Sequence, residues 1–264
     1  MRHFALLIFT LITPPGVASE AAPAASFSIV ETYPHDTRDF TQGLLLHDNI
    51  LIESTGGYGT SHLHFRDVTG RTIKPSVTLD DRYFGEGITV VNERLWQVTW
   101  RSRKGFIYDL DGRRESQFEI SGEGWGLASD GAQIFLSDGS AFVQRIDPAS
   151  GAVIDRIHVR DGDREVIHLN ELEFIDGRLF ANVWLTDRIA IIHPDTGRVE
   201  AWLDLATLRN HFDPPPGFRP RDHVLNGIAW DADRRLLLVT GKCWPHLFAL
   251  RIDLLTAPDT SPDR

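Results

Sequence analysis

The sequence is poor in the residues and motifs from which many common sites are built. Its single cysteine, Cys243, excludes a disulfide within the chain, and no Cys/His pattern has the spacing of a zinc site. The motifs Gly-x-Ser-x-Gly and His-Glu-x-x-His and the glycine-rich phosphate loop are missing, and the 11 histidines are scattered. We therefore expect a site that uses neither a metal nor a cofactor.

Positive charge is also in deficit. The chain has 27 Lys and Arg against 37 Asp and Glu, which gives a formal net charge of −10. Such a surface gains no counterion release on nucleic acid and is not attracted to anionic membranes. We expect neither of them as a partner of the mature protein. With 42% hydrophobic residues, the chain has enough apolar side chains to bury a substantial core.

Long hydrophobic runs are absent except at the start of the chain. Apolar residues 4–12 are followed by a Pro-Pro-Gly break and then by small residues. This order is typical of a secretory signal peptide, and the run is too short for a permanent membrane anchor. We expect residues 1–25 to be a signal peptide and short leader, cut between Ser19 and Ala25. The mature protein would then be periplasmic or secreted.

Helical periodicity is scarce, with one short candidate at 205–211, and a strand–turn–strand phrase recurs in its place. Each copy starts with a small or acidic residue, continues with apolar residues and enters a turn rich in Asp, Asn and Gly. A second apolar strand follows, which is the pattern of a β-hairpin. The five copies begin at Gly43, Gly87, Gly126, Glu171 and Gly227.

A second marker, a turn that ends in glycine, follows each of the first four copies. Gly70, Gly112, Gly151 and Gly197 are separated by 42, 39 and 46 residues. A period of about 40 to 45 residues is typical of a four-stranded propeller blade. The sequence therefore predicts an all-β, five-bladed β-propeller of antiparallel strands over residues 26–256, with a polar tail at 257–264. A β-sandwich or an open solenoid is the alternative.

The fifth repeat is one strand short. After the apolar residues 247–252 only the polar tail remains, whereas residues 27–33 form an unassigned strand at the other end of the chain. Pairing this N-terminal strand with the last blade would close the ring and cover two sheet edges that otherwise invite aggregation.

The residue just before each copy of the repeat is a candidate for the site. The innermost strand of each blade lines a central channel, so repeat symmetry places these five side chains at one mouth of it. For the amides, the structural alternative is that they only satisfy backbone groups of turns. The five residues are Gln42, Glu86, Trp125, Asn170 and Asn226.

A second ring comes from residues that end the following strands, Trp100, Trp184 and Lys242. Indoles exclude water and hold a flat group, while amides recognise another amide. Glu86 is the one carboxylate in the first ring, and desolvation by aromatic walls would raise its pKa toward that of a proton shuttle. A solvated turn glutamate is the alternative interpretation. Glu171 is a rival, but strand alternation predicts that it points away from the channel.

The interval between the fourth and fifth repeats is longer than the others. It contains a proline-rich stretch, residues 210–220, with three consecutive prolines. Prolines stiffen a loop, so we expect a rigid rim rather than a mobile lid. An inert insertion without a role in the chemistry is the alternative.

These segments resemble the plant-type glutaminyl-peptide cyclotransferases, whose bacterial relatives share the fold. The resemblance rests on ordered motifs along nearly the whole mature chain, among them Phe-Thr-Gln-Gly-Leu at 40–44, Phe-Gly-Glu-Gly at 84–87 and Thr-Gly-Lys at 240–242. It implies a five-bladed propeller, unrelated to the zinc-dependent animal enzymes of the same activity, with Glu86 as the acid/base residue. The substrate-binding residues that it implies are Phe40, Gln42, Phe84, Trp100, Trp125, Asn170, Trp184 and Lys242.

The expected reaction converts the N-terminal glutamine of a peptide or protein into pyroglutamate and releases ammonia. The substrate carries its own nucleophile, so the enzyme needs only to orient it and to move protons. We expect a monomer. The alternative function is a non-catalytic periplasmic propeller that binds peptide or protein, and a metal-dependent lactonase-like propeller would need convergent ligands that the sequence does not offer.

Overall fold

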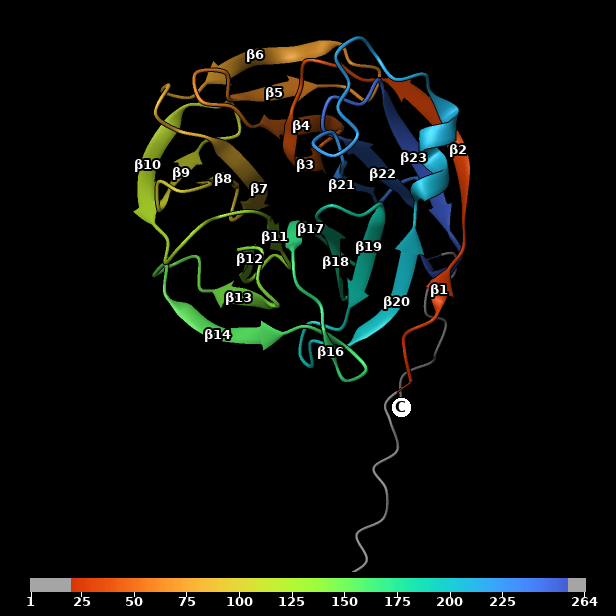
Figure 1. Cartoon of the computed structure of the whole chain (residues 1–264). Helices are drawn as coiled ribbons and strands as arrows, with labels where there is room; N and C mark the ends of the chain where they lie inside the picture. The colour runs from red at the N-terminus through yellow and green to blue at the C-terminus, as the bar shows by residue number, and fades with distance from the viewer. Residues whose placement is uncertain (1–19, 256–264) are drawn as a thin grey trace, which may run out of the picture.

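A computed structural model describes residues 20–255 of the chain and shows five β-sheets arranged around a central axis (Figure 1). The first blade consists of β3 (Thr41–His47), β4 (Ile50–Thr55), β5 (His62–Arg66) and β6 (Thr72–Thr78). The second consists of β7 (Gly85–Val91), β8 (Arg94–Thr99), β9 (Lys104–Tyr108) and β10 (Arg114–Glu119). The third consists of β11 (Leu127–Ser129), β12 (Ile134–Ser137), β13 (Phe142–Ile146) and β14 (Val153–His158).

The last two blades carry additions from elsewhere in the chain. The fourth consists of β17 (Leu169–Ile175), β18 (Arg178–Val183), β19 (Arg188–Ile192) and β20 (Val199–Asp204), with β1 (Ala24–Ala25) parallel to β20. The fifth consists of β21 (Leu225–Asp231), β22 (Leu236–Gly241), β23 (His246–Ile252) and, outermost, β2 (Phe27–Pro34). The small hairpin β15 (Arg160–Asp161) and β16 (Arg164–Glu165) links the third blade to the fourth.

The expected fold class is confirmed, since five blades of four antiparallel strands each account for 20 of the 23 strands within residues 20–255. The unassigned N-terminal strand pairs with the last blade, because β2 lies antiparallel to β23 from Phe27–Ile252 to Pro34–His246. The helical candidate at 205–211 is a 3-10 turn, η1 (Ala206–His211), and η2 (Asp253–Leu255) is shorter still. No helix within residues 20–255 is long and apolar enough to cross a membrane.

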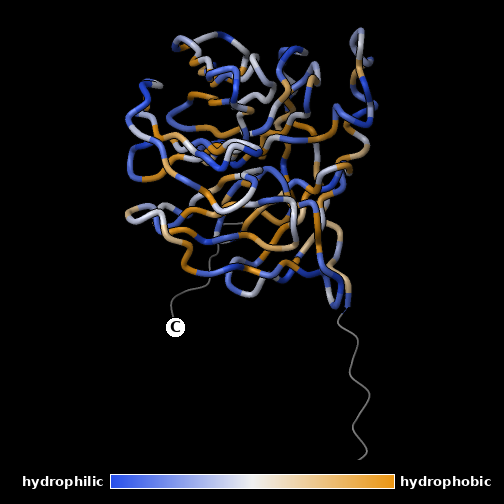
Figure 2. The backbone as a smooth tube through the Cα atoms, turned by 60° about the vertical axis from the view of Figure 1, so that its left-hand side comes forward, coloured by the Kyte–Doolittle hydropathy of each residue, from blue (hydrophilic) through white to orange (hydrophobic). Residues whose placement is uncertain are grey.

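The core is divided among the interfaces between blades. Five clusters of buried residues occur within residues 20–255, and each joins two adjacent sheets. Trp96 packs between the second and third blades and Trp202 between the third and fourth. Burying one large apolar side chain contributes about 1.5–3 kcal/mol, so these interfaces hold the blades in fixed positions. Apolar segments accordingly follow the strands inside the molecule, with polar segments at its turns (Figure 2).

Glycines in the repeat permit the inner strands to approach one another at the axis. A Cβ at Gly87 would lie 2.5 Å from the backbone nitrogen of Leu127, and one at Gly126 would lie 2.0 Å from the carbonyl oxygen of Asn170. Both distances are too short for any side chain. The recurrent glycine is therefore a requirement of the closed ring.

Glu171 replaces this glycine in the fourth repeat, and here the sequence-based expectation is wrong. Its side chain enters the central space and accepts hydrogen bonds from the backbone nitrogens of Leu44 (3.2 Å) and Ile228 (2.8 Å). These residues belong to β3 and β21, the inner strands of the first and fifth blades. Burial, followed by the neighbouring Glu173, raises the pKa of Glu171 well above its usual value. The carboxyl thus fills the room that the four glycines leave.

The predicted domain limits fall partly outside the described residues. The apolar run at 4–12 and the tail at 257–264 lie outside residues 20–255. The start of the described chain packs against the fourth blade: the Trp202 amide donates to the Pro23 carbonyl (2.8 Å), and the Ala22 amide donates to Asp161 Oδ1 (2.6 Å).

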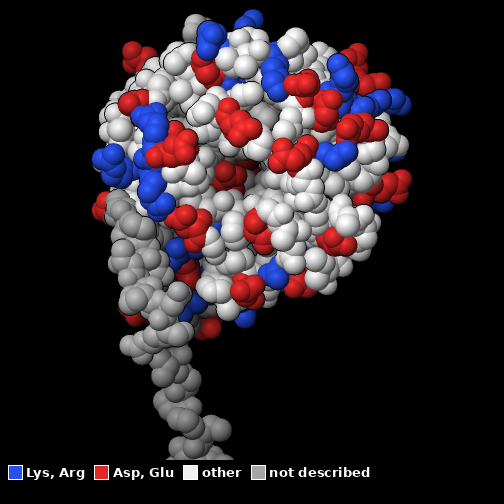
Figure 3. Space-filling view, turned by 180° about the vertical axis from the view of Figure 1, so that it is seen from behind, with Lys and Arg blue, Asp and Glu red and all other residues white. Residues whose placement is uncertain are grey.

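Seen from behind, the molecule carries mixed charges, with acidic side chains around a central hollow (Figure 3).

Candidate active site

A cavity of about 280 Å³ opens on the propeller axis, and we call it the axial pocket. Four polar side chains are almost completely buried and form its floor, five aromatic side chains are half-buried and form its walls, and two charged side chains lie exposed at its mouth. The nine site residues that the family resemblance implies all line this pocket. The floor residues are Gln42, Glu86, Asn170 and Lys242. The wall residues are Phe40, Phe84, Trp100, Trp125 and Trp184. The mouth residues are Arg219 and Asp222.

Irregular strand starts aim the floor residues into the pocket. Pairing between the first two strands of a blade shifts register between Thr41 and Gly43, and corresponding shifts occur in the second, fourth and fifth blades. Such a bulge places an extra residue in one strand and re-aims its side chain. Gln42, Glu86 and Asn170 lie within these shifts. Repeat symmetry therefore puts them at equivalent heights, as the sequence predicts.

A chain of side-chain amides supports the carboxyl of Glu86. Gln42 Nε2 donates to Glu86 Oε1 at 3.2 Å, and Asn226 Nδ2 donates to Gln42 Oε1 at 3.4 Å and to the Thr41 carbonyl at 3.0 Å. Asn226 was expected in the first ring, but it lies behind Gln42 and does not line the pocket. Asn170 lines the pocket, and its buried Oδ1 has no hydrogen-bond partner within residues 20–255. That oxygen is a free acceptor for an N–H of a bound molecule.

Burial dominates the acid–base properties of the floor. Desolvation raises the pKa of Glu86 well above its usual value, Lys242 opposes this shift, and Glu123 adds to it. Desolvation lowers the pKa of Lys242 to about 8, although Glu86 opposes that shift. The Lys242 ammonium lies 4.9 Å from the centre of the Phe40 ring, which is a cation–π distance. Burial therefore shifts the pKa values of the two groups in opposite directions, upward for Glu86 and downward for Lys242.

The walls are aromatic rings in edge-to-face contact. Trp125 and Trp184 have ring centres 5.6 Å apart and nearly perpendicular planes, and Phe84 contacts Trp100 at 5.5 Å. Room for Phe84 depends on Gly56, where a Cβ would lie 2.2 Å from the ring. Rings in such contacts fix one another and keep water from the floor.

Glu123 holds two of the indoles, and sequence reasoning missed it. Its Oε2 accepts from the indole nitrogens of Trp100 (2.8 Å) and Trp125 (3.0 Å), and its Oε1 accepts from Arg101 (3.1 Å). Burial would raise the pKa of Glu123, but its hydrogen bonds to Trp125, Trp100 and Arg101 outweigh burial and lower it. Its position two residues before Trp125 was the one sign in the sequence that Glu123 lies near the site. Only the fold brings Trp100 to the same carboxyl oxygen.

The loop that contains the proline-rich stretch reaches the pocket. Residues 212–224, between η1 and β21, bring Arg219 and Asp222 to the mouth of the pocket. Phe218 packs edge-on against His223 at 5.0 Å, and His223 contacts Phe40 of the wall at 6.3 Å. The loop therefore lines the mouth of the pocket, and neither Arg219 nor Asp222 was predicted from the sequence.

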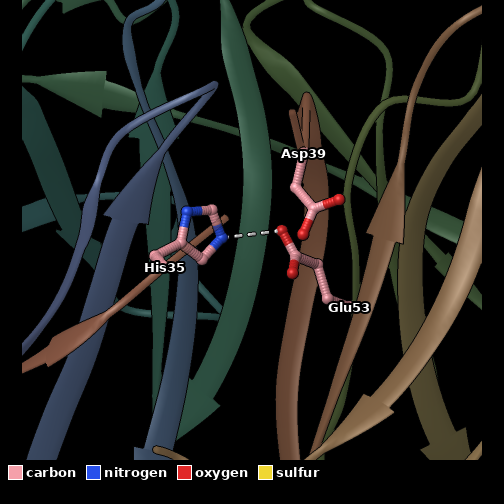
Figure 4. Close-up of side chains that lie close together, drawn as sticks. All are labelled: His35, Asp39 and Glu53. Atoms are coloured by element: carbon pink, nitrogen blue, oxygen red, sulfur yellow. Dashed lines mark hydrogen bonds and ion pairs between the residues drawn. The ribbon is translucent and has the colours of Figure 1, made fainter. Parts of the chain in front are cut away.

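A second cluster of chemistry-bearing residues lies outside the pocket, beside the first and fifth blades. His35 Nε2 lies 3.0 Å from Glu53 Oε1, and Asp39 is close to both residues (Figure 4). Arg66 Nη1 contacts Asp39 Oδ2 at 2.6 Å and Glu53 Oε2 at 3.2 Å, and Thr41 donates to Glu53 Oε1 at 2.7 Å. The protein's own donors thus occupy the two carboxylates, and we interpret the cluster as a structural ion-pair network.

The fold and the pocket define a five-bladed β-propeller with a pocket on its axis, whose floor holds a buried carboxyl and a buried amine. The family model for glutamine cyclotransferase matches residues 3–252. The glutaminyl-peptide cyclotransferase of Arabidopsis thaliana is 43% identical over 234 residues, which are 87% of this chain and 72% of that protein. The crystal structure of Myxococcus xanthus glutaminyl cyclase is similar with a TM-score of 0.81 and 31% identity, over 88% of this chain and 98% of that one. The chain therefore belongs to the glutamine cyclotransferase family.

Proposed function

We propose that the protein is a glutaminyl-peptide cyclotransferase that converts N-terminal glutamine of peptides and proteins into pyroglutamate. The observation that carries this proposal is the buried carboxyl of Glu86, which lines the axial pocket together with an amide donor, Gln42, and the ammonium of Lys242. Family membership favours this enzyme over a propeller that only binds peptide.

In the proposed reaction the substrate's neutral α-amine attacks the carbonyl carbon of its own side-chain amide. A carbon–nitrogen bond forms and closes the five-membered ring, and the bond to the amide nitrogen breaks. Glu86 takes the proton that the amine loses and passes it to the departing nitrogen, which leaves as ammonia. Atoms balance without a co-reactant, because one proton moves from one nitrogen to the other.

The neighbours of Glu86 have distinct roles in this proposal. The free Oδ1 of Asn170 accepts an N–H of the substrate, and Gln42 orients Glu86 and the substrate amide. The Lys242 ammonium stabilises negative charge on the amide oxygen as the ring closes. Trp100, Trp125 and Trp184 form a dry wall around the aliphatic part of the glutamine.

Incubation with a Gln-Ala peptide tests the proposal directly. Mass spectrometry should show the loss of one ammonia per peptide, and an ammonia assay should show the same amount released. The rate should survive treatment with a chelator, since the site uses side chains alone. A peptide that binds but remains intact would support the binding propeller and overturn the enzymatic proposal.

We further propose that the protein is exported and acts in the periplasm or outside the cell as a monomer. The apolar run at 4–12 and the small residues after it support export. Cleavage before Ala22 would keep β1 paired with β20 and the Ala22 contact to Asp161 intact. A cut after Ala22 would remove that contact, and a cut after Ala25 would remove β1 as well. The intact mass of the exported protein tests this: a start after Ala25 would contradict it.

A further inference from the structure

The mouth of the axial pocket carries an ion pair that the proposed mechanism does not use. Arg219 Nε lies 2.6 Å from Asp222 Oδ2, and the two side chains are 66% and 55% exposed. Both line the pocket, whereas the polar floor residues Glu86 and Lys242 are each 4% exposed. The pair therefore stands where a bound molecule passes from the pocket into solvent.

Short-range hydrogen bonds support the backbone that carries this ion pair. The amides of Asp222 and His223 both donate to the Arg219 carbonyl, at 2.9 and 2.8 Å, which closes a tight turn. The Arg219 amide in turn donates to His223 Nδ1 at 3.2 Å, and the indole of buried Trp244 donates to the His223 carbonyl at 3.0 Å. The turn is thus tied to the fifth blade, and its charged side chains project from a supported backbone.

The size of the pocket determines what reaches this turn. A cavity of about 280 Å³ is at the small end of the range for ligand sites, and its floor must take both the α-amine and the side-chain amide of glutamine. One residue, folded back on itself for ring closure, fills such a space. The rest of the peptide must leave through the mouth, so its second residue passes the charged side chains there.

We propose that Arg219 and Asp222 form a subsite for the second residue of the peptide. Asp222 attracts a basic side chain at that position, and Arg219 attracts an acidic one. This inference rests on the proposed function, because only a substrate anchored by its N-terminal glutamine places its second residue at the mouth. The paired charges cancel, so the wild-type enzyme accepts second residues of either sign, and removal of one partner exposes the other.

Three peptides that differ only in the second residue test the subsite: Gln-Glu, Gln-Ala and Gln-Lys, each with the same neutral extension. The measured quantity is the ratio of kcat/KM for the Gln-Lys peptide to that for the Gln-Glu peptide, followed by ammonia release at low salt. Asp222→Asn should lower this ratio and Arg219→Gln should raise it, each about twofold to fivefold, the range of exposed charge pairs. High salt should shrink both changes because exposed charges are screened.

Arg94→Gln is the matched control, because it removes one positive charge from an exposed surface pair with Glu115 that does not line the pocket. Its ratio should equal that of the wild type. Thermal unfolding of each variant identifies any loss of fold. If the wild type leaves the Gln-Ala peptide intact, the proposed function fails. If the wild type cyclises all three peptides but the ratio is the same in all variants, the subsite alone is overturned.

Discussion

Gln42 and Glu86 come from different blades, and their side chains meet at the floor of the pocket, with the amide nitrogen 3.2 Å from the carboxyl oxygen. The contact fixes the orientation of a buried acid whose pKa burial raises well above its usual value. A carboxyl with a raised pKa binds a proton more readily than a solvated one, which favours a role in proton transfer. This part of the floor is thus built from two inner strands, β3 and β7, that the propeller holds together.

The first prediction concerns Glu86 itself. Glu86→Gln keeps the size and the hydrogen bond to Gln42 but removes the titratable proton. We expect kcat for ammonia release to fall about 100-fold to 10,000-fold, the usual range for a lost acid–base group, while the melting temperature stays at or above that of the wild type. Glu115→Gln, on an exposed strand edge, is the matched control. Near-normal turnover in Glu86→Gln would remove this residue from the mechanism.

The second prediction concerns the alkaline side of the pH profile. Burial lowers the pKa of Lys242 to about 8, so its ammonium is lost as the pH rises through that value. We therefore expect kcat/KM to fall above about pH 8. Lys242→Met should lower kcat about 100-fold to 1,000-fold, the range for a lost oxyanion donor. Lys242→Arg keeps its charge at high pH, so kcat/KM of this variant should no longer fall above about pH 8. A fall at the same pH would show that another group causes the decline.

The third prediction concerns Glu123, which positions the indoles of Trp100 and Trp125. Glu123→Gln retains an acceptor oxygen but removes a negative charge that helps to raise the pKa of Glu86. The acid limb of kcat/KM, which reports deprotonation of Glu86, should therefore move to lower pH. Glu123→Ala also removes the acceptor and should raise KM several-fold more than the glutamine variant. Equal KM values and an unmoved acid limb in both variants would show that Glu123 has no positioning role.

The fourth prediction concerns stability. Burial alone would lower the pKa of His35, but the charge and hydrogen bond of Glu53, with help from the Trp244 carbonyl and Asp39, raise it to about 9. Because the folded pKa exceeds the unfolded value of about 6.5, this stabilisation is complete below pH 6.5 and is lost as the pH rises through 9. It amounts to roughly 3 kcal/mol. Denaturant unfolding of wild type and His35→Gln should show a stability difference that shrinks between pH 6.5 and 9; a constant difference would contradict the network.

The sequence alone was enough to predict the blades and most of the pocket. The period between Gly70, Gly112, Gly151 and Gly197 follows from the length of a four-stranded sheet, so it is visible without coordinates. Gln42, Glu86 and Asn170 could be grouped because they occupy the same position in their repeats. Repeat symmetry therefore gives them equivalent positions around the axis. The residues that flank them in the sequence belong to the motifs by which the chain resembles the family.

Only the tertiary structure decided where individual repeats depart from the shared pattern. Glu171 stands where the other copies have glycine, and alternation within one strand could not show that its carboxyl reaches backbone nitrogens of two other blades. Glu123, Arg219 and Asp222 lie in connecting loops, whose paths depend on packing against neighbouring blades rather than on a local pattern. The repeated sequence pattern determines the features that all blades share. Contacts between distant segments determine where one blade differs from another, and those contacts exist only once the ring of blades is assembled.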